Sequence, residues 1–107
     1  MVGVRSETLK KYGAVSEQTA REMAEGVRRL TGSTYGLATT GVAGPSGGTP
    51  DKPVGTVWIA CATADSTTAV LLSLGTFREQ NIEVTIVQVL NLLRKTMANQ
   101  RNKTAIA

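Results

Sequence analysis

The 107-residue sequence contains no histidine, a single cysteine and few aromatic residues. Without histidine, the chain lacks the side chain that most often exchanges protons near neutral pH. The lone Cys61 has no intramolecular disulfide partner, so we expect a reducing compartment and a cytoplasmic location. No apolar run reaches the roughly 18 residues of a membrane span, and none near residue 1 has signal-peptide length. A chain of this length suits one domain. Because no apolar run is long enough to span a membrane, we expect no membrane partner.

The net charge of +4 is unevenly distributed. No acidic residue follows Glu83, whereas Arg94, Lys95, Arg101 and Lys103 lie beyond it. These cations suit a solvated helix end, where they face the negative pole of the helix dipole. A nucleic-acid patch is the alternative, but stacking on bases requires exposed aromatic side chains, which this region lacks. We therefore expect no nucleic-acid partner.

The first forty residues predict two helices and a strand. A short helix over Ser6–Tyr12 ends at Gly13, and Ser16 is typical of the N-cap of a second helix that Gly32 closes. A strand over Tyr35–Thr40 follows. The second helix has apolar residues three and four positions apart, which places them on one face: Ala20, Met23, Ala24, Val27 and Leu30.

The second half predicts a hairpin and a long helix. The almost continuous apolar run Val54–Thr63 is typical of a central strand that is covered on both faces. A turn over Ala64–Thr67 leads to an antiparallel strand over Thr68–Leu74. Residues 82–87 alternate as a strand would, but a helical period continues for four turns without glycine or proline, so we expect a helix over Arg78–Ala98. The series that carries this period is Ile82, Ile86, Val89, Leu93 and Met97.

These elements predict an α/β fold. We expect a mixed sheet of about three strands, packed with two long helices and one short helix. Residues 1–98 would form the single domain, and residues 99–107 a flexible basic tail.

Residues 40–56, TGVAGPSGGTPDKPVGT, crowd five glycines and three prolines into one connection. Glycine adopts positive φ and lets the backbone approach a ligand closely, whereas proline restricts the loop's freedom. Successive backbone N–H groups in such loops form nests that bind anions. The pattern is not the nucleotide-binding G-x-x-x-x-G-K-[ST], because no Gly-Lys-Ser/Thr occurs. A ligand-binding loop and a structural Ω-loop both remain open.

The stretch TGVAGPSGGTPDKPVGTV strongly resembles the signature of the competence-damage-inducible protein C-terminal domain family. The upstream YGAVSEQTAREMAEGVR is similar to a second family stretch, and GTFREQ more loosely to its C-terminal end. The resemblance implies a nicotinamide-nucleotide amidase, which hydrolyses nicotinamide mononucleotide to nicotinate mononucleotide and ammonia without a metal or cofactor.

The family's serine nucleophile lies in an Ala-Glu-Ser-Cys-Thr-Gly-Gly segment and its lysine base in a Tyr-Ser-Asn-x-x-Lys segment. Neither segment occurs in these 107 residues, which match the later two-thirds of the family domain. We therefore expect an incomplete version of the family fold that is inactive alone and associates into homo-oligomers through the exposed surface. The alternative is a non-catalytic module that binds a nucleotide or a partner chain.

The resemblance also implies a substrate side, in which backbone N–H groups of glycine face a developing oxyanion or the nucleotide. Arg78, at the start of the last helix, would meet a phosphate beside the positive helix pole, or else remain a solvated cation. Thr49 and Lys52 are weaker candidates for ligand contact, and the alternative is that they only shape the turn. The expected substrate-binding residues are Thr40, Gly41, Val42, Ala43, Gly44 and Arg78.

No residue of this chain is expected to be catalytic. Ser46 would need an activating base, and Lys52, six residues away, is a remote candidate for that role. Both residues are better interpreted as solvent-exposed residues of the loop than as a catalytic pair. Cys61 stands between Ala60 and Ala62 in the apolar run, so we expect it to pack in the core.

Overall fold

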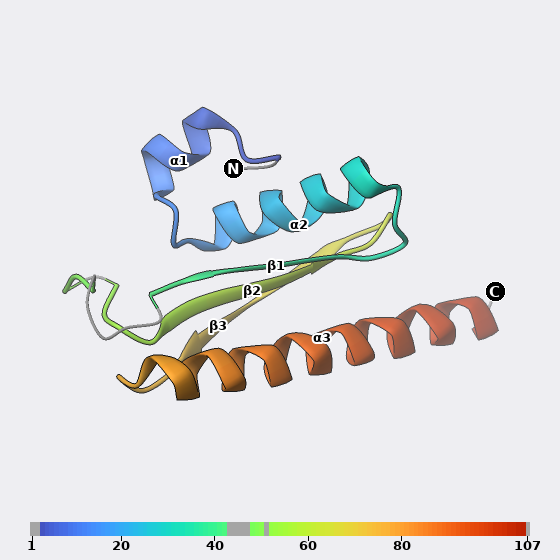
Figure 1. Ribbon diagram of the computed structural model, residues 1–107. Helices are drawn as coiled ribbons and strands as arrows, with labels where there is room; N and C mark the ends of the chain where they lie inside the picture. The colour runs from blue at the N-terminus through green and yellow to red at the C-terminus, as the bar shows by residue number, and fades with distance from the viewer. Residues whose placement is uncertain (1–2, 43–47, 51, 107) are drawn as a thin grey trace.

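The computed structural model describes residues 3–42, 48–50 and 52–106, the last six by their backbone alone. Its elements follow in the order α1 (Ser6–Tyr12), α2 (Glu17–Thr31), β1 (Gly36–Gly41), β2 (Thr56–Ala62), β3 (Thr67–Ser73) and α3 (Arg78–Ile106). They form layers, with α1 and α2 on one face of the sheet and α3 on the other (Figure 1). The α/β class is confirmed, and the elements lie close to the positions that the sequence predicts.

The sheet has the strand order β1-β2-β3, and both neighbouring pairs are antiparallel. Cys61 in the central strand pairs with Leu37 on one side and Thr68 on the other. The sequence predicted a mixed sheet, and this was wrong for the described strands. Both connections reverse the chain direction, whereas a parallel pair needs a crossover, which is usually a helix.

Strand β2 is buried on both faces, as its continuous apolar sequence predicts. Towards α2 the core consists of small side chains, which let the helix approach the sheet closely: Ala20, Ala24, Ala38, Ala60 and Ala62. Towards α3 the core consists of larger side chains: Val57, Ile59, Cys61 and Leu92. The prediction that Cys61 packs in the core is therefore confirmed.

The predicted ends of α2 are confirmed. The backbone N–H of Thr19 donates to Oγ of Ser16 over 3.2 Å, which satisfies one of the free donors of the first turn. At the other end, Gly32 adopts the left-handed conformation with φ of 67°. These local signals determine where α2 begins and ends.

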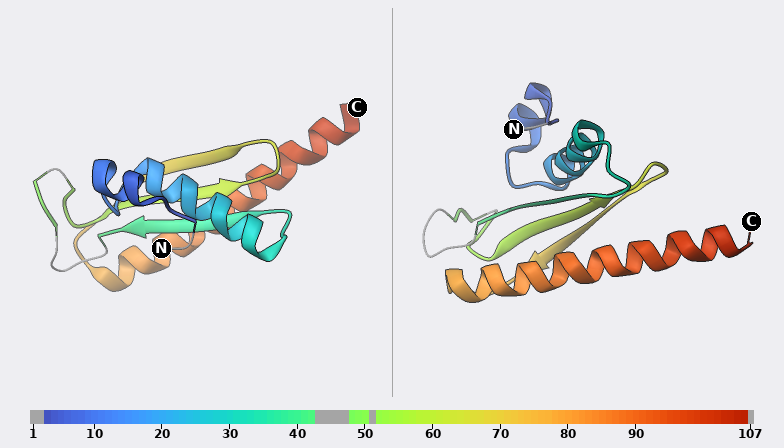
Figure 2. Two further views of the ribbon diagram at one scale, coloured as in Figure 1. Left: turned by 90° about the horizontal axis from the view of Figure 1, so that it is seen from above. Right: turned by 45° about the vertical axis from the view of Figure 1, so that its right-hand side comes forward.

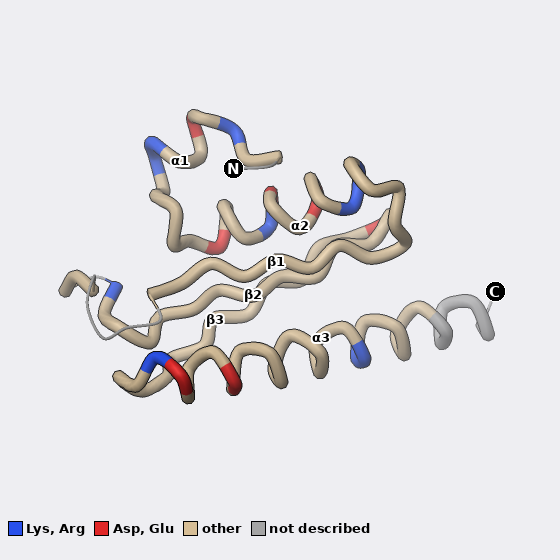
Figure 3. The backbone as a smooth tube through the Cα atoms, in the orientation of Figure 1, with Lys and Arg blue, Asp and Glu red and all other residues tan. Residues whose placement is uncertain are grey.

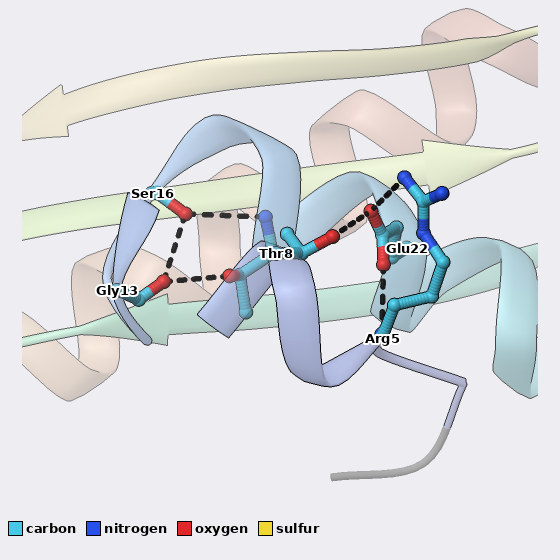
Figure 4. A network of polar contacts seen from close by, with 6 residues as sticks. Arg5, Thr8, Gly13, Ser16 and Glu22 are labelled. Carbon is cyan, nitrogen blue, oxygen red and sulfur yellow. Dashed lines mark hydrogen bonds and ion pairs between the residues drawn. The ribbon is translucent and has the colours of Figure 1, made fainter. Parts of the chain in front are cut away.

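A polar network joins α1 to α2 through Glu22 (Figure 4). One carboxylate oxygen accepts from the backbone N–H of Arg5 over 2.9 Å, and the other accepts from Oγ1 of the buried Thr8 over 2.6 Å. The Arg5 guanidinium lies 3.3 Å away. Burial acts to raise the pKa of Glu22, but these hydrogen bonds and the Arg5 charge outweigh it and hold the pKa below its ordinary value.

Helix α3 spans 29 residues. The choice of helix over strand for residues 82–87 is confirmed. The helix continues past Ala98 to Ile106, so the backbone of residues 99–106 is helical where the sequence predicted a flexible tail. No glycine or proline interrupts residues 78–106, which explains the extension. Among the described helices, none has the length and apolar character that crossing a membrane requires.

The face that α3 turns to the sheet differs from the predicted one. Asn81 and Leu92 are buried, with 3% and 8% of their surfaces exposed, whereas Ile82 and Ile86 are 40% and 54% exposed. The predicted series is correct only in its middle, where Val89 and Leu93 pack against the core. The cause is the oblique path of α3, whose first half runs outside the edge of β1 (Figure 2).

Candidate functional site

The predicted substrate side begins at the end of β1, where most polar groups already have partners. Oγ1 of Thr40 donates to the carbonyl of Ala14 over 2.7 Å. Val42 donates its backbone N–H to the carbonyl of Thr56 over 2.8 Å. Residues two apart in an antiparallel strand direct their backbone groups the same way, so the backbone N–H of Thr40 also points to β2. The intervening Gly41 directs its N–H away from β2, to the open side of the sheet.

The described glycines of the loop serve two different needs. Gly55 has φ of 94°, and a Cβ there would meet the carbonyl oxygens of Leu74 and Gly75. Gly41 and Gly48 do not have positive φ. A Cβ on Gly41 would lie 2.7 Å from the carbonyl oxygen of Thr56, so glycine permits close packing of the two chain segments there.

Lys52 is bound to α1. Its Nζ donates to the carbonyl of Tyr12 over 2.9 Å, at the C-terminal end of α1. The backbone N–H of Lys52 donates to Oγ1 of Thr49, and the N–H of Thr49 donates to the carbonyl of Lys52, each over 3.0 Å. The expectation that Thr49 and Lys52 shape a turn is confirmed. Ala43, Gly44 and Ser46 lie outside the described residues.

A groove of about 570 Å³ separates the end of β1 from the first half of α3. Thr39, Thr40 and Gly41 line one side, and Val57 of β2 contributes to its floor. The opposite side is mainly aliphatic and comes from α3: Ile82, Ile86, Val89 and Leu90. Two of the six expected site residues, Thr40 and Gly41, therefore line the same cavity.

The groove also contains polar residues that the sequence reasoning missed. Asn81 is buried, and its Nδ2 donates to the carbonyl of Gly75 over 2.7 Å. Thr85 donates from Oγ1 to the carbonyl of Asn81, also over 2.7 Å. A polar pair four residues apart in an otherwise apolar helix was the available signal, because such spacing places both side chains on one face.

Arg78 is the first residue of α3, where the sequence predicted the helix to begin. Its side chain is exposed, and it does not line the groove, whereas Asn81 one turn later does. The start of α3 lies at the same end of the molecule as the loop between β1 and β2 (Figure 1). The groove is therefore mainly apolar with a few polar residues, and it lies near the start of α3. A helix N-terminus favours anions.

The alternative nucleophile Cys61 is buried inside the core, and burial raises the pKa of its thiol. A raised pKa reduces the fraction of the reactive thiolate, so the residue is a packing element. Within residues 3–42, 48–50 and 52–106, no group of acidic residues and cysteine forms a metal site.

Comparison with protein families and sequences gives consistent matches. A family model described as the CinA C-terminal domain matches residues 1–97. The CinA-like protein of Amoebophilus asiaticus is 50% identical over 97 residues, which make up 91% of this chain and 23% of that protein. The CinA-like protein of Cytophaga hutchinsonii is 47% identical over 94 residues, 88% of this chain and 22% of that protein. The chain thus spans less than a quarter of the length of these curated relatives.

Solved structures share the fold. The competence/damage inducible protein CihA from Agrobacterium tumefaciens superposes with a TM-score of 0.85 at 36% identity, covering 89% of this chain and 59% of that one. A CinA superfamily protein from Klebsiella pneumoniae gives a TM-score of 0.86 at 31% identity, covering 92% of this chain and 61% of that one. About two fifths of each solved relative therefore lies outside the shared part.

Proposed function

The chain belongs to the CinA C-terminal domain family, and from that premise we propose that it forms the substrate side of a nicotinamide-nucleotide amidase. The substrate is nicotinamide mononucleotide, whose carboxamide is hydrolysed to a carboxylate and ammonia. The proposal rests on the resemblance of residues 40–57 to the amidase signature and on the groove that the end of β1 lines. The cytoplasmic location expected from the free cysteine belongs to the same proposal.

The observation that carries this proposal is the position of Gly41. Its backbone N–H points to the open side of the sheet, and both this residue and the buried Asn81 line the groove. Amide hydrolysis develops negative charge on the carbonyl oxygen, and a fixed backbone donor stabilises that charge. The apolar α3 side of the groove suits the flat face of a nicotinamide ring, while the nearby helix N-terminus suits its phosphate.

In this proposal the present chain binds and orients the substrate, and the serine and lysine segments of the family supply the nucleophile and the base. Those two segments do not occur among the 107 residues. The chain alone is therefore expected to bind nicotinamide mononucleotide and to release no ammonia from it.

Calorimetric titration with nicotinamide mononucleotide, together with an ammonia assay, tests both statements. Nicotinamide riboside, which lacks the phosphate, is the matched control ligand and should bind more weakly. No binding at millimolar nucleotide would reject a substrate-side role for this chain by itself. Turnover of about one per second or more would point to a nucleophile within the chain.

A second candidate is a non-catalytic module that binds a nucleotide or a partner chain. It would use the same groove beside the end of β1 and needs neither catalytic segment. Joining the unmatched part of the Agrobacterium relative to this chain separates the two candidates. Ammonia release by the joined protein supports the amidase, whereas nucleotide binding without ammonia release supports the module.

A further inference from the structure

Helix α3 has an exposed face on the side opposite the sheet. Leu90 and Arg94 each lie two positions from Leu92, which is buried in the core. Glu83 lies two positions from Asn81, which is also buried. Two positions correspond to about 200° around a helix, so these exposed residues point away from the sheet. Because α3 is the outermost layer on its side of the sheet (Figure 1), no described element covers them.

The residues of this face follow a heptad spacing, in which steps of three and four positions alternate. Such spacing keeps side chains in one stripe along a helix, and two helices that pair side by side meet along stripes of this kind. Val87, Leu90 and Met97 are its apolar members, with 62%, 57% and 43% of their surfaces exposed. We call the whole set the outer stripe; it consists of Gln80, Glu83, Val87, Leu90, Arg94 and Met97.

The two charges of the outer stripe are separated along the helix. Glu83 lies towards the start of α3 and Arg94 towards its end, and the turns between them carry no charged residue (Figure 3). No ion pair of the described residues involves Glu83, and the Arg94 guanidinium donates to Oδ1 of Asn91 rather than to a carboxylate. Eleven positions, or about 16 Å of helix, separate the two charges, so they cannot pair within one chain. Both are available to a partner.

The outer stripe is complementary to itself in the antiparallel direction. A two-fold axis that passes between positions 88 and 89 brings each residue of the stripe opposite another one in a second copy. Val87 then lies opposite Leu90 of the second copy, and Glu83 lies opposite its Arg94. Each contact occurs twice, because the interface is symmetric. A parallel pair would instead bring each charge opposite its own copy, which is repulsive.

We propose that the outer stripe of α3 binds a second copy of this chain as an antiparallel helix pair. The apolar centre is formed by Val87 and Leu90 of both copies, and the ion pairs between Glu83 and Arg94 fix the direction and register. This interface is smaller than that of a permanent dimer, so association is reversible and depends on protein concentration. The proposal assigns a surface to the homo-oligomer that the sequence predicts. It does not depend on the substrate or on whether the chain contributes to an amidase.

Sedimentation equilibrium of the 107-residue chain tests the association. The measured mass should rise from 11.3 kDa towards twice that value as the protein concentration increases to about 1 mM. In NMR spectra recorded over the same range, the side-chain signals of Val87, Leu90 and Met97 should shift together with the mass. Signals of exposed residues outside α3 should not shift.

Charge reversal identifies the contact and its direction. Glu83→Arg and Arg94→Glu each bring like charges together twice in the dimer, so each should weaken association about tenfold. The double variant restores both pairs and should dimerise as the wild type does. An equimolar mixture of the two single variants should form a heterodimer, because every charge then meets its opposite. Asp65→Arg and Lys95→Glu make the same changes of charge at exposed positions outside the stripe and should leave the dimer unchanged.

Three results would overturn the proposal. One is a wild-type chain that stays monomeric at about 1 mM. Another is a dimer that tolerates both single charge reversals, because a different surface would then hold it together. The third is a dimer that is lost when the unmatched part of the Agrobacterium relative is joined to the chain, since that part would then cover the stripe. Ammonia release is not part of this readout, so an inactive dimer would contradict only the amidase.

Discussion

Nζ of Lys52 donates a hydrogen bond to the carbonyl oxygen of Tyr12 over 2.9 Å, although 40 positions separate the two residues. The bond ties the connection between β1 and β2 to the last turn of α1, where unpaired carbonyl groups attract cations. The loop lysine therefore stabilises the protein's own helix end. A ligand at the end of β1 would instead meet backbone groups and the start of α3.

Replacing Lys52 with methionine should loosen this loop while the rest of the fold stays intact. A hydrogen bond of this kind contributes roughly 0.5–1.5 kcal/mol, so local opening should increase about three- to tenfold. Amide exchange at Thr49, whose N–H donates to the carbonyl of Lys52, reports the change. Lys95→Met, an exposed position on α3, is the control. Unchanged exchange at Thr49 would show that the bond to α1 does not hold the loop.

Gly55 and Gly75 allow a matched test of backbone strain. Gly55→Ala places a Cβ against neighbouring carbonyl oxygens at φ of 94°, so unfolding should become easier by about 1–3 kcal/mol from strain alone. Gly75 does not have positive φ and has open space around its Cα, so Gly75→Ala should be almost neutral. Urea unfolding of both variants measures the difference. Equal stabilities would mean that the turn before β2 adapts to a side chain.

The parts of the fold that local chemistry determines were predictable from the sequence. Ser16 and Gly32 mark the ends of α2, and the continuous apolar run identifies β2 as the central strand. The orientation of α3 was not predictable. Its apolar residues surround most of the helix, so periodicity did not reveal that Asn81 faces the sheet while Ile82 faces the groove.

The candidate site was predictable in part for a similar reason. The motif identified Thr40 and Gly41, which line the groove, but it could not show that the Thr40 hydroxyl is bound to Ala14. Contacts between residues far apart in the chain depend on the packed fold. The same applies to Lys52, whose charge suggested a ligand contact and whose partner is Tyr12.

Acidification should weaken the attachment of α1 through Glu22. The pKa of Glu22 in the folded protein is lowered from 4.5, because hydrogen bonds from Arg5 and Thr8 outweigh its burial. A lowered pKa stabilises the fold above the unfolded value, and this contribution is lost as pH falls through the folded value. Glu22→Gln should therefore lower the melting temperature at pH 7, and its difference from wild type should shrink between about pH 5 and pH 3.

Melting curves across this pH range, with Glu83→Gln as the control, test the prediction. Glu83 is an exposed carboxylate on α3, away from the polar network. A difference between wild type and Glu22→Gln that stays constant down to pH 3 would show that the charge of Glu22 does not stabilise α1.

The last prediction concerns Arg78. A cation in the first turn of a helix faces the positive pole of the dipole, which is unfavourable unless an anion lies nearby. Arg78 occupies this position in α3, one turn before Asn81 in the groove wall. If a nucleotide phosphate binds there, a charge-assisted hydrogen bond contributes roughly 1.5–3 kcal/mol. Arg78→Ala should then weaken binding of nicotinamide mononucleotide about ten- to a hundredfold.

Arg94→Ala is the matched control for Arg78→Ala, because Arg94 is exposed on the same helix and its guanidinium bonds to Asn91. Calorimetry with nicotinamide riboside separates a phosphate contact from a general loss of binding, since Arg78→Ala should not affect a ligand without phosphate. Equal affinity of wild type and Arg78→Ala for the nucleotide would make Arg78 a solvated surface cation. The anion preference of the groove would then rest on the backbone N–H groups at the start of α3 alone.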